Sequence, residues 1–190
     1  MVLEIKFYGD HILRKKGKPV KTFGEPLRQF SRDMLAVMHE AEGIGLAAQQ
    51  VGEALQFCIV EVTQELEKVP IKCIFDGKTI PQDLLLPLFL ANPVITSFEK
   101  PREFCEEGCL SFPGIRGEVE RPVGISISFQ DLEGNPHTLA CDGLLARCIQ
   151  HEMDHLNGIL FIDRMQKSAM LEIDDEVRDL KKRTIQQIKD

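Results

Sequence analysis

Near its C-terminal end the chain reads Gln150-His151-Glu152-Met153-Asp154-His155. Residues four apart on a helix lie on one face, with their Cβ atoms about 6 Å apart. On a helix, His151 and His155 would therefore hold one metal ion between them, and Glu152 would face a water bound to that ion. This spacing favours metal-assisted hydrolysis. From this stretch alone, the alternative is a surface helix that carries two unconnected histidines.

Length, composition and charge limit the class of protein. The chain has 190 residues, 43% hydrophobic and 28% charged, and we expect residues 1–190 to form a single catalytic domain with a buried core. The formal net charge of −7 argues against DNA as a partner. Neither a signal peptide nor a run of roughly 18 apolar residues occurs, so we expect a cytoplasmic protein without membrane contact. The six cysteines are then thiols or metal ligands.

Hydrophobic spacing and turn residues predict an α+β fold. Helical spacing predicts a helix over residues 26–41, a second from about 143 to 157 and a last one over 168–187. Alternating or β-branched residues predict short strands at 56–62, 71–75, 94–95, 124–130 and 137–141. We therefore expect short antiparallel strands packed around a central metal-binding helix, with an N-terminal and a C-terminal helix. The 64–90 connection is long and poorly patterned.

Two histidines do not fix a metal ion, because a catalytic site of this type uses three protein ligands and keeps one position for water. A downstream glutamate, Glu172 or Glu176, would make the chain a zinc endopeptidase, although both lie in an acidic run typical of a solvated helix start. Cys109 is an upstream candidate, because a thiol ionises beside a cation. Taken alone, one of six cysteines is more often a buried structural thiol. A closed structural site would need a fourth ligand, for which Cys105 is available.

Three motifs, in this order along the chain, resemble those of the peptide deformylase family. Residues 43–50 read Gly-Ile-Gly-Leu-Ala-Ala-Gln-Gln, residues 107–111 read Glu-Gly-Cys-Leu-Ser, and residues 150–155 read Gln-His-Glu-Met-Asp-His. Each matches its family motif in full: G-x-G-L-A-A-x-Q, E-G-C-L-S and Q-H-E-x-D-H. With Arg121-Pro122 and a match near the start, the resemblance covers about residues 5–165.

The resemblance implies an enzyme that removes the N-formyl group from the formyl-methionine of nascent polypeptides and releases formate. It makes Cys109, His151 and His155 the ligands of one divalent metal ion, with water in the fourth position. The family's ion is commonly Fe²⁺, which we expect in the cell, whereas a purified sample could hold Zn²⁺, Ni²⁺ or Co²⁺.

The same resemblance implies the catalytic groups. Glu152 is the general base that takes a proton from the attacking water and later delivers it to the leaving amine. The side-chain amide of Gln50 and the backbone N–H of Leu110 are the donors that stabilise the oxyanion.

An extended substrate peptide is implied to pair with the protein backbone like an added strand, at Ile44, Gly45 and the carbonyl of Gly108. The two glycines of residues 43–45 would permit this close approach. Arg116 is expected near the bound peptide.

The methionine side chain needs an apolar pocket. Leu144 and Cys148 share a helix face with the two histidines and are expected to line it. Cys105 falls near the expected pocket wall. Arg147 stands where many relatives carry an apolar residue, and we expect its stem to pack while its charge reaches solvent.

The ribosome is a further expected partner. The family's C-terminal helix can dock on ribosomal RNA, and the last helix here carries a basic end that would suit this role. A solvated helix face explains the same residues equally well. They are Arg178, Lys181, Lys182 and Arg183.

Overall fold

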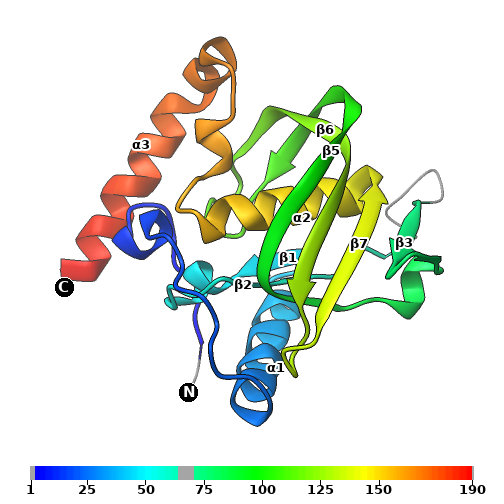
Figure 1. Ribbon diagram of the computed structural model, residues 1–190. Coiled ribbons are helices and arrows are strands. Elements are labelled where there is room, and N and C mark those ends of the chain that lie inside the picture. The colour runs from blue at the N-terminus through cyan, green and yellow to red at the C-terminus, as the bar shows by residue number, and fades with distance from the viewer. Residues whose placement is uncertain (1–2, 64–70, 190) are drawn as a thin grey trace.

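The computed structural model describes residues 3–63 and 71–189, which form one antiparallel sheet and three α-helices (Figure 1). The order of the seven described strands in the sheet is β1-β2-β5-β6-β7-β3-β4. This confirms the α+β class. The helices are α1 (Glu25–Glu40), α2 (Gly143–Leu156) and α3 (Lys167–Lys189), and the strands are β1 (Gly45–Ala47), β2 (Phe57–Val60), β3 (Cys73–Phe75), β4 (Lys78–Thr79), β5 (Leu88–Gly108), β6 (Arg116–Gln130) and β7 (Pro136–Asp142).

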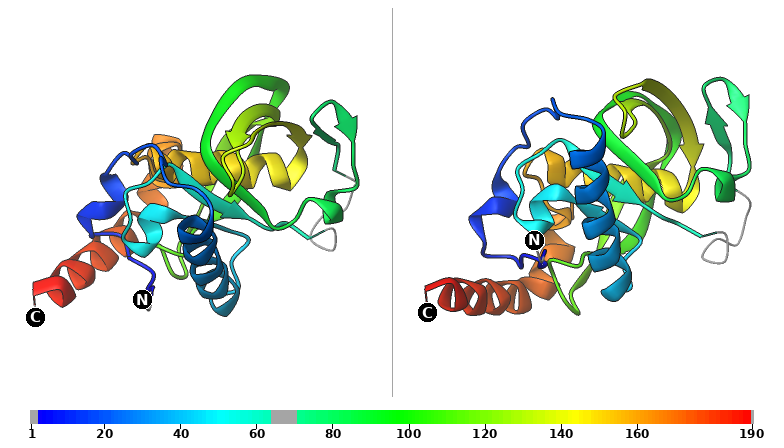
Figure 2. Two further views of the ribbon diagram at one scale, coloured as in Figure 1. Left: turned by 60° about the horizontal axis from the view of Figure 1, so that its bottom comes forward. Right: turned by 90° about the horizontal axis from the view of Figure 1, so that it is seen from below.

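Two strands are much longer than expected. β5 has 21 residues and β6 has 15, so the prediction of short strands is wrong for this pair. The outer half of β5, residues 98–106, is exposed, so it lacks the buried positions that make a strand visible in a sequence. Register shifts interrupt the pairing between residues 91 and 102. Such shifts bend a strand pair, and the β5–β6 ribbon curves over α2 (Figures 1 and 2).

The helix α2 crosses the middle of the molecule, as expected of the central metal-binding helix (Figure 1). Eleven of its 14 residues are buried, because β1 and β2 cover it on one side and β6 and β7 on another. It ends at Leu156, whose carbonyl accepts a hydrogen bond from the N–H of Gly17 at 2.8 Å. Burial on several sides places the Gln150–His155 motif inside the protein rather than on a solvated surface.

The outer helices agree with their predicted ranges within two residues, and α3 begins one residue before Ser168. Val177 and Leu180 anchor α3 in a cluster with Leu13 and Phe161. Part of the 64–90 connection is now defined, because β3, β4 and the start of β5 lie in it, whereas residues 64–70 lie outside the described residues. Within the described ranges, no helix is both long enough and apolar enough to cross a membrane.

His137 joins the β3–β4 hairpin to β7. Its Nδ1 lies 2.7 Å from Oδ2 of Asp76, and its Nε2 lies 3.3 Å from Oδ2 of Asp131. Burial lowers the pKa of His137, but the hydrogen bonds and charges of the two aspartates outweigh burial and raise this pKa above its ordinary value. The hydrogen bond from His137 in turn lowers the pKa of Asp76.

These shifts predict a pH dependence of stability. A histidine whose folded-state pKa is raised contributes its full stabilisation below the unfolded-state pKa of about 6.5 and loses it as the pH rises through the folded-state value. We expect the thermal midpoint of His137→Gln to fall furthest below that of the parent near pH 6, and the gap to narrow by about pH 8.5. The exposed histidine variant His11→Gln is the control. A gap that is the same at every pH would contradict the prediction.

Candidate metal centre

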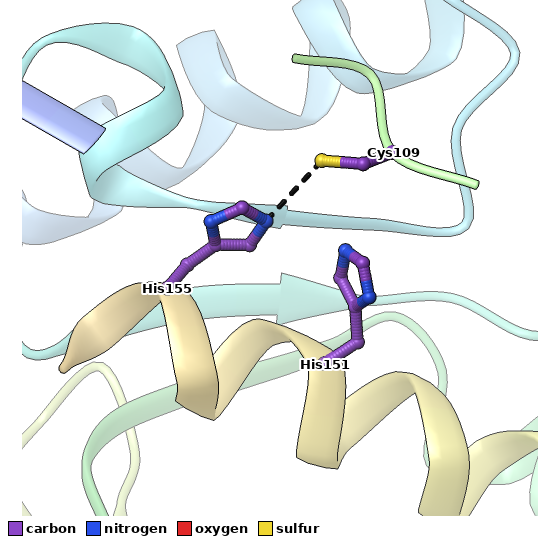
Figure 3. Close-up of side chains that lie close together, drawn as sticks. All are labelled: Cys109, His151 and His155. Carbon is purple, nitrogen blue, oxygen red and sulfur yellow. Dashed lines mark hydrogen bonds between the residues drawn. The ribbon is translucent and has the colours of Figure 1, made fainter. Parts of the chain in front are cut away.

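Cys109, His151 and His155 come together from two parts of the chain, the loop after β5 and one face of α2 (Figure 3). Sγ of Cys109 lies 3.3 Å from Nε2 of His155, and one ligand atom from each residue lies within 4.8 Å of the other two. The two imidazole rings have centroids 5.0 Å apart at an interplanar angle of 72°. A thiol and two imidazoles at this spacing match a metal site that leaves one position free.

The two imidazoles have different surroundings. Burial lowers the pKa of His151, but its hydrogen bonds to Cys109 and Glu107 outweigh burial and raise this pKa well above its ordinary value. Nδ1 of His151 donates to Oε2 of Glu107 at 2.9 Å, which leaves Nε2 to face the other ligands. Burial lowers the pKa of His155, and the charges of His151 and Arg121 lower it further. A neutral imidazole is the form that binds a metal ion.

Glu107 lies at the centre of a buried ion network that was not anticipated from the sequence. Its carboxylate accepts two hydrogen bonds from Arg121, at 2.6 and 2.9 Å, and Arg121 also donates to Asp154 at 2.9 Å. Asp154 accepts two more from Arg164, at 2.6 and 3.1 Å. Burial raises the pKa of Glu107, but the hydrogen bonds from His151 and Arg121 bring it down to about 2. The one sign of this network in the sequence is that Glu107 and Asp154 are charged residues inside the matched motifs.

Glu152 directly follows His151 in the chain and is buried, with 3% of its surface exposed. Burial, with a contribution from the charge of Glu107, raises its pKa to about 7 despite the opposing charges of His151 and Arg121. Its Oε2 has no hydrogen-bond partner among the described residues. Because buried polar atoms in native proteins are almost always paired, this oxygen is suited to a bound water or a substrate group.

The glycine at position 45 allows β1 to pass close to α2. A Cβ at Gly45 would overlap the Glu152 carboxylate and lie 2.7 Å from Sγ of Cys148. The carbonyl of Ile44 already accepts from the N–H of Glu61 at 2.8 Å. We therefore expect a substrate peptide that pairs at this position to accept a hydrogen bond from the backbone N–H of Ile44.

The Gln50 side chain is held with its amide nitrogen toward the Cys109 thiol. Its Oε1 accepts from the backbone N–H of Ala47 at 2.8 Å, and its Nε2 lies 3.4 Å from Sγ of Cys109 and 3.3 Å from Oγ of Ser111. Gln50 is 1% exposed. Leu110 directly follows Cys109 in the chain. Both expected oxyanion donors thus belong to segments next to the thiol.

Gly108 and Arg116 face each other at the end of the β5–β6 ribbon. A Cβ at Gly108 would have ordinary contacts, 3.6 Å from Cγ of Arg116. The Arg116 side chain is largely exposed and lies 3.5 Å from a carboxylate oxygen of Glu106. This strand end lies next to Cys109, where the expected peptide would pass.

The expected pocket residues differ in their surroundings. Cys148 is buried, which raises the pKa of its thiol, and Leu144 is half-buried against the same apolar cluster. Cys105 is exposed. The expectation for Arg147 is wrong: its side chain is 11% exposed, and its Nη1 donates to Oε1 of Glu107 at 3.0 Å rather than reaching solvent. The buried carboxylate draws the guanidinium inward.

The downstream glutamates do not join the histidines. Glu172 and Glu176 are exposed residues of α3, whereas Cys109 lies within contact of His155. The endopeptidase alternative is therefore not favoured.

Comparisons with known proteins agree with this geometry. Residues 2–170 match the family model described as polypeptide deformylase. A peptide deformylase from Opitutus terrae is 50% identical over 185 residues, which cover 97% of this chain and 95% of that protein. One from Synechococcus sp. (strain CC9605) is 44% identical over 163 residues, which cover 86% and 73%.

Solved structures show the same fold. A peptide deformylase from Synechococcus elongatus in complex with actinonin has a TM-score of 0.77 at 41% identity, over 92% of this chain and 85% of that one. A plant peptide deformylase has a TM-score of 0.82 at 36% identity, over 97% and 92%. The chain therefore belongs to the peptide deformylase family, the metal-dependent hydrolases that remove the N-formyl group from nascent peptides.

Proposed function

We propose that Cys109, His151 and His155 hold the divalent metal ion at which this chain removes the formyl group. The observation that carries the proposal is the convergence of one thiol and two imidazoles within 4.8 Å, beside a buried carboxylate. One sulfur and two nitrogen donors suit Fe²⁺, Zn²⁺, Co²⁺ and Ni²⁺. We propose Fe²⁺ as the ion in the cell.

Glu152 is proposed as the general base. When bound, the metal ion supplies Lewis-acid chemistry that polarises the formyl oxygen and acidifies a water molecule. Glu152 takes a proton from that water as the water oxygen bonds to the formyl carbon. The carbon–nitrogen bond then breaks, formate leaves, and Glu152 delivers the proton to the released amine. Its unpaired Oε2 supports this role, because a proton carrier needs a free oxygen in the site.

Gln50 and Leu110 are proposed to stabilise the oxyanion. The hydrogen bond from Ala47 fixes the Gln50 amide, so its N–H groups need no reorientation during the reaction. The backbone N–H of Leu110 would supply the second donor.

We propose that the substrate peptide binds as an added strand between the segment with Ile44 and Gly45 and the strand end at Gly108, near Arg116. Main-chain pairing of this kind tolerates many side chains beyond the first residue.

The methionine side chain is proposed to enter a pocket lined by Leu144 and Cys148. The burial of Cys148 supports the proposal, because a buried thiol would contribute to an apolar lining.

The chemistry of the thiols supports a proposal for the compartment. All six cysteines are free, and a metal-binding thiol has to stay reduced. We therefore propose that the chain works in the cytoplasm, where it meets formylated nascent peptides.

Replacement of the proposed base tests the mechanism. We expect Glu152→Gln to keep its bound metal and its fold but to lose activity by about 10²–10⁴-fold, the usual contribution of a general base. Formate release from formyl-Met-Ala and metal content per chain are measured together. Glu176→Gln, an exposed glutamate on α3, is the matched control and should match the parent. Full activity in Glu152→Gln would refute the assignment.

Replacement of the proposed thiol ligand tests the metal site. We expect Cys109→Ala to lose both metal and formate release, because two imidazoles alone hold a divalent ion poorly. Cys105→Ala removes an exposed thiol four residues earlier and should keep both. Metal content is determined by mass spectrometry after anaerobic purification. Metal retained at the parent level in Cys109→Ala would instead support a downstream glutamate ligand.

The ribosome is proposed as a partner of α3. Two of its basic residues already have acidic neighbours, since Arg178 lies 2.8 Å from Asp174 and Lys182 lies 3.4 Å from Asp179. The exposure of the basic end supports docking.

The double variant Lys182→Glu/Arg183→Glu reverses two charges on exposed positions of α3. If α3 docks on ribosomal RNA, co-sedimentation with ribosomes should weaken at least about tenfold and become less sensitive to salt. Activity on free formyl-Met-Ala should not change. Unaltered co-sedimentation would exclude this part of α3 as the docking surface.

A further inference from the structure

Arg147 lies on α2 one helical turn before His151, and its guanidinium is bonded inside the protein. Nη1 lies 3.0 Å from Oε1 of Glu107 and 3.0 Å from the carbonyl oxygen of Val119. Nη2 lies 2.8 Å from the carbonyl oxygen of Glu103. One side chain of α2 therefore donates to both strands of the β5–β6 ribbon.

The ribbon carries the proposed thiol ligand. In the β5–β6 register, Val119 lies opposite Cys105 and Gly108 opposite Arg116, and Cys109 follows Gly108 directly. Figure 3 shows the Cys109 segment across from α2, with the side chains of His151 and His155 projecting from α2 toward the thiol. The distance from the thiol to the imidazoles therefore depends on how the ribbon is held against α2.

Arg147 is not needed to neutralise Glu107. Arg121 already donates two hydrogen bonds to that carboxylate, at 2.6 and 2.9 Å. Loss of Arg147 would leave the buried charge paired, so the large penalty for an isolated buried charge does not arise. What would be lost are the donors to the Val119 and Glu103 carbonyls and one of the four hydrogen bonds that fix Glu107, the partner of His151.

We infer that Arg147 is a positioning residue for deformylation. It fixes the β5–β6 ribbon, and with it Cys109, at the correct distance from His151 and His155, and it does not bind the substrate. The inference rests on the proposed metal ligands.

The test compares Arg147→Met with a matched arginine on the ribbon. Methionine keeps a long apolar stem but no donor. Arg102→Met is the control, because Arg102 donates to the carbonyl of Glu120 at 3.1 Å, is about half exposed and makes none of the bonds to Glu107. Each protein is loaded anaerobically with Co²⁺. The readouts are the thiolate and ligand-field absorption bands, the rate of Co²⁺ loss to a chelator, kcat and KM for formyl-Met-Ala, and the thermal midpoint.

We expect Arg147→Met to lose about 10–100-fold in metal affinity or kcat, the range found for groups that orient metal ligands. Its ligand-field bands should change and its Co²⁺ should leave faster, while KM stays within about twofold of the parent because the substrate contacts are intact. Arg102→Met should match the parent.

Two results would overturn the inference. A raised KM with parent-like absorption and Co²⁺ release would make Arg147 a substrate contact. A lowered thermal midpoint with all other readouts unchanged would make it a structural residue alone.

A second variant decides the matter if Arg147→Met does not fold. Arg147→Lys keeps the charge but loses the planar fork that reaches three acceptors, so Co²⁺ should still leave faster than from the parent. Release at the parent rate would refute the positioning role. If the parent itself lacks the thiolate absorption band, the proposed ligands are wrong, which is a separate failure.

Discussion

A carboxylate buried against a helix has to be neutralised, and the arrangement of the metal centre follows from how Glu107 meets this requirement. Arg121 pairs with Glu107 through two hydrogen bonds and with Asp154 through a third, which links the strands of the ribbon to α2. The Glu107 carboxylate also accepts one hydrogen bond from His151 and one from Arg147. The same carboxylate that Arg121 neutralises therefore also orients His151, a proposed metal ligand.

On the opposite side of the candidate metal centre, the arrangement depends on the close packing of β1 against α2 rather than on charge. β1 passes next to α2 at Gly45, where a side chain would overlap Glu152. The turn that follows places Gln50 where Ala47 fixes its amide beside Cys109. The proposed base Glu152, the Gln50 amide and the Cys109 thiol are thus held close together by fixed neighbours, as preorganised catalytic groups would be.

Much of this was predictable from the sequence, and the exceptions have physical reasons. The Gln150–His155 spacing and the three motifs predicted Cys109, His151 and His155 as a group, and the fold brings these three side chains together. Helical spacing located α1, α2 and α3 to within two residues at each end. The outer half of β5 was missed because its residues are exposed and carry no alternating pattern. Arg147 was misjudged because a side chain's partner depends on tertiary contacts, here a buried carboxylate 40 residues earlier in the chain. Buried ion networks leave little trace in hydrophobic spacing.

The central claim is that one thiolate and two imidazoles of this chain hold the catalytic metal ion. X-ray absorption spectroscopy of the anaerobically prepared, Zn²⁺-loaded protein tests it directly. The account predicts one sulfur neighbour at about 2.3 Å and two imidazole nitrogens at about 2.0–2.1 Å, with one further light atom. Either a first shell without sulfur, as a glutamate ligand would give, or one with two sulfurs, as a closed structural site with a second cysteine would give, would contradict it.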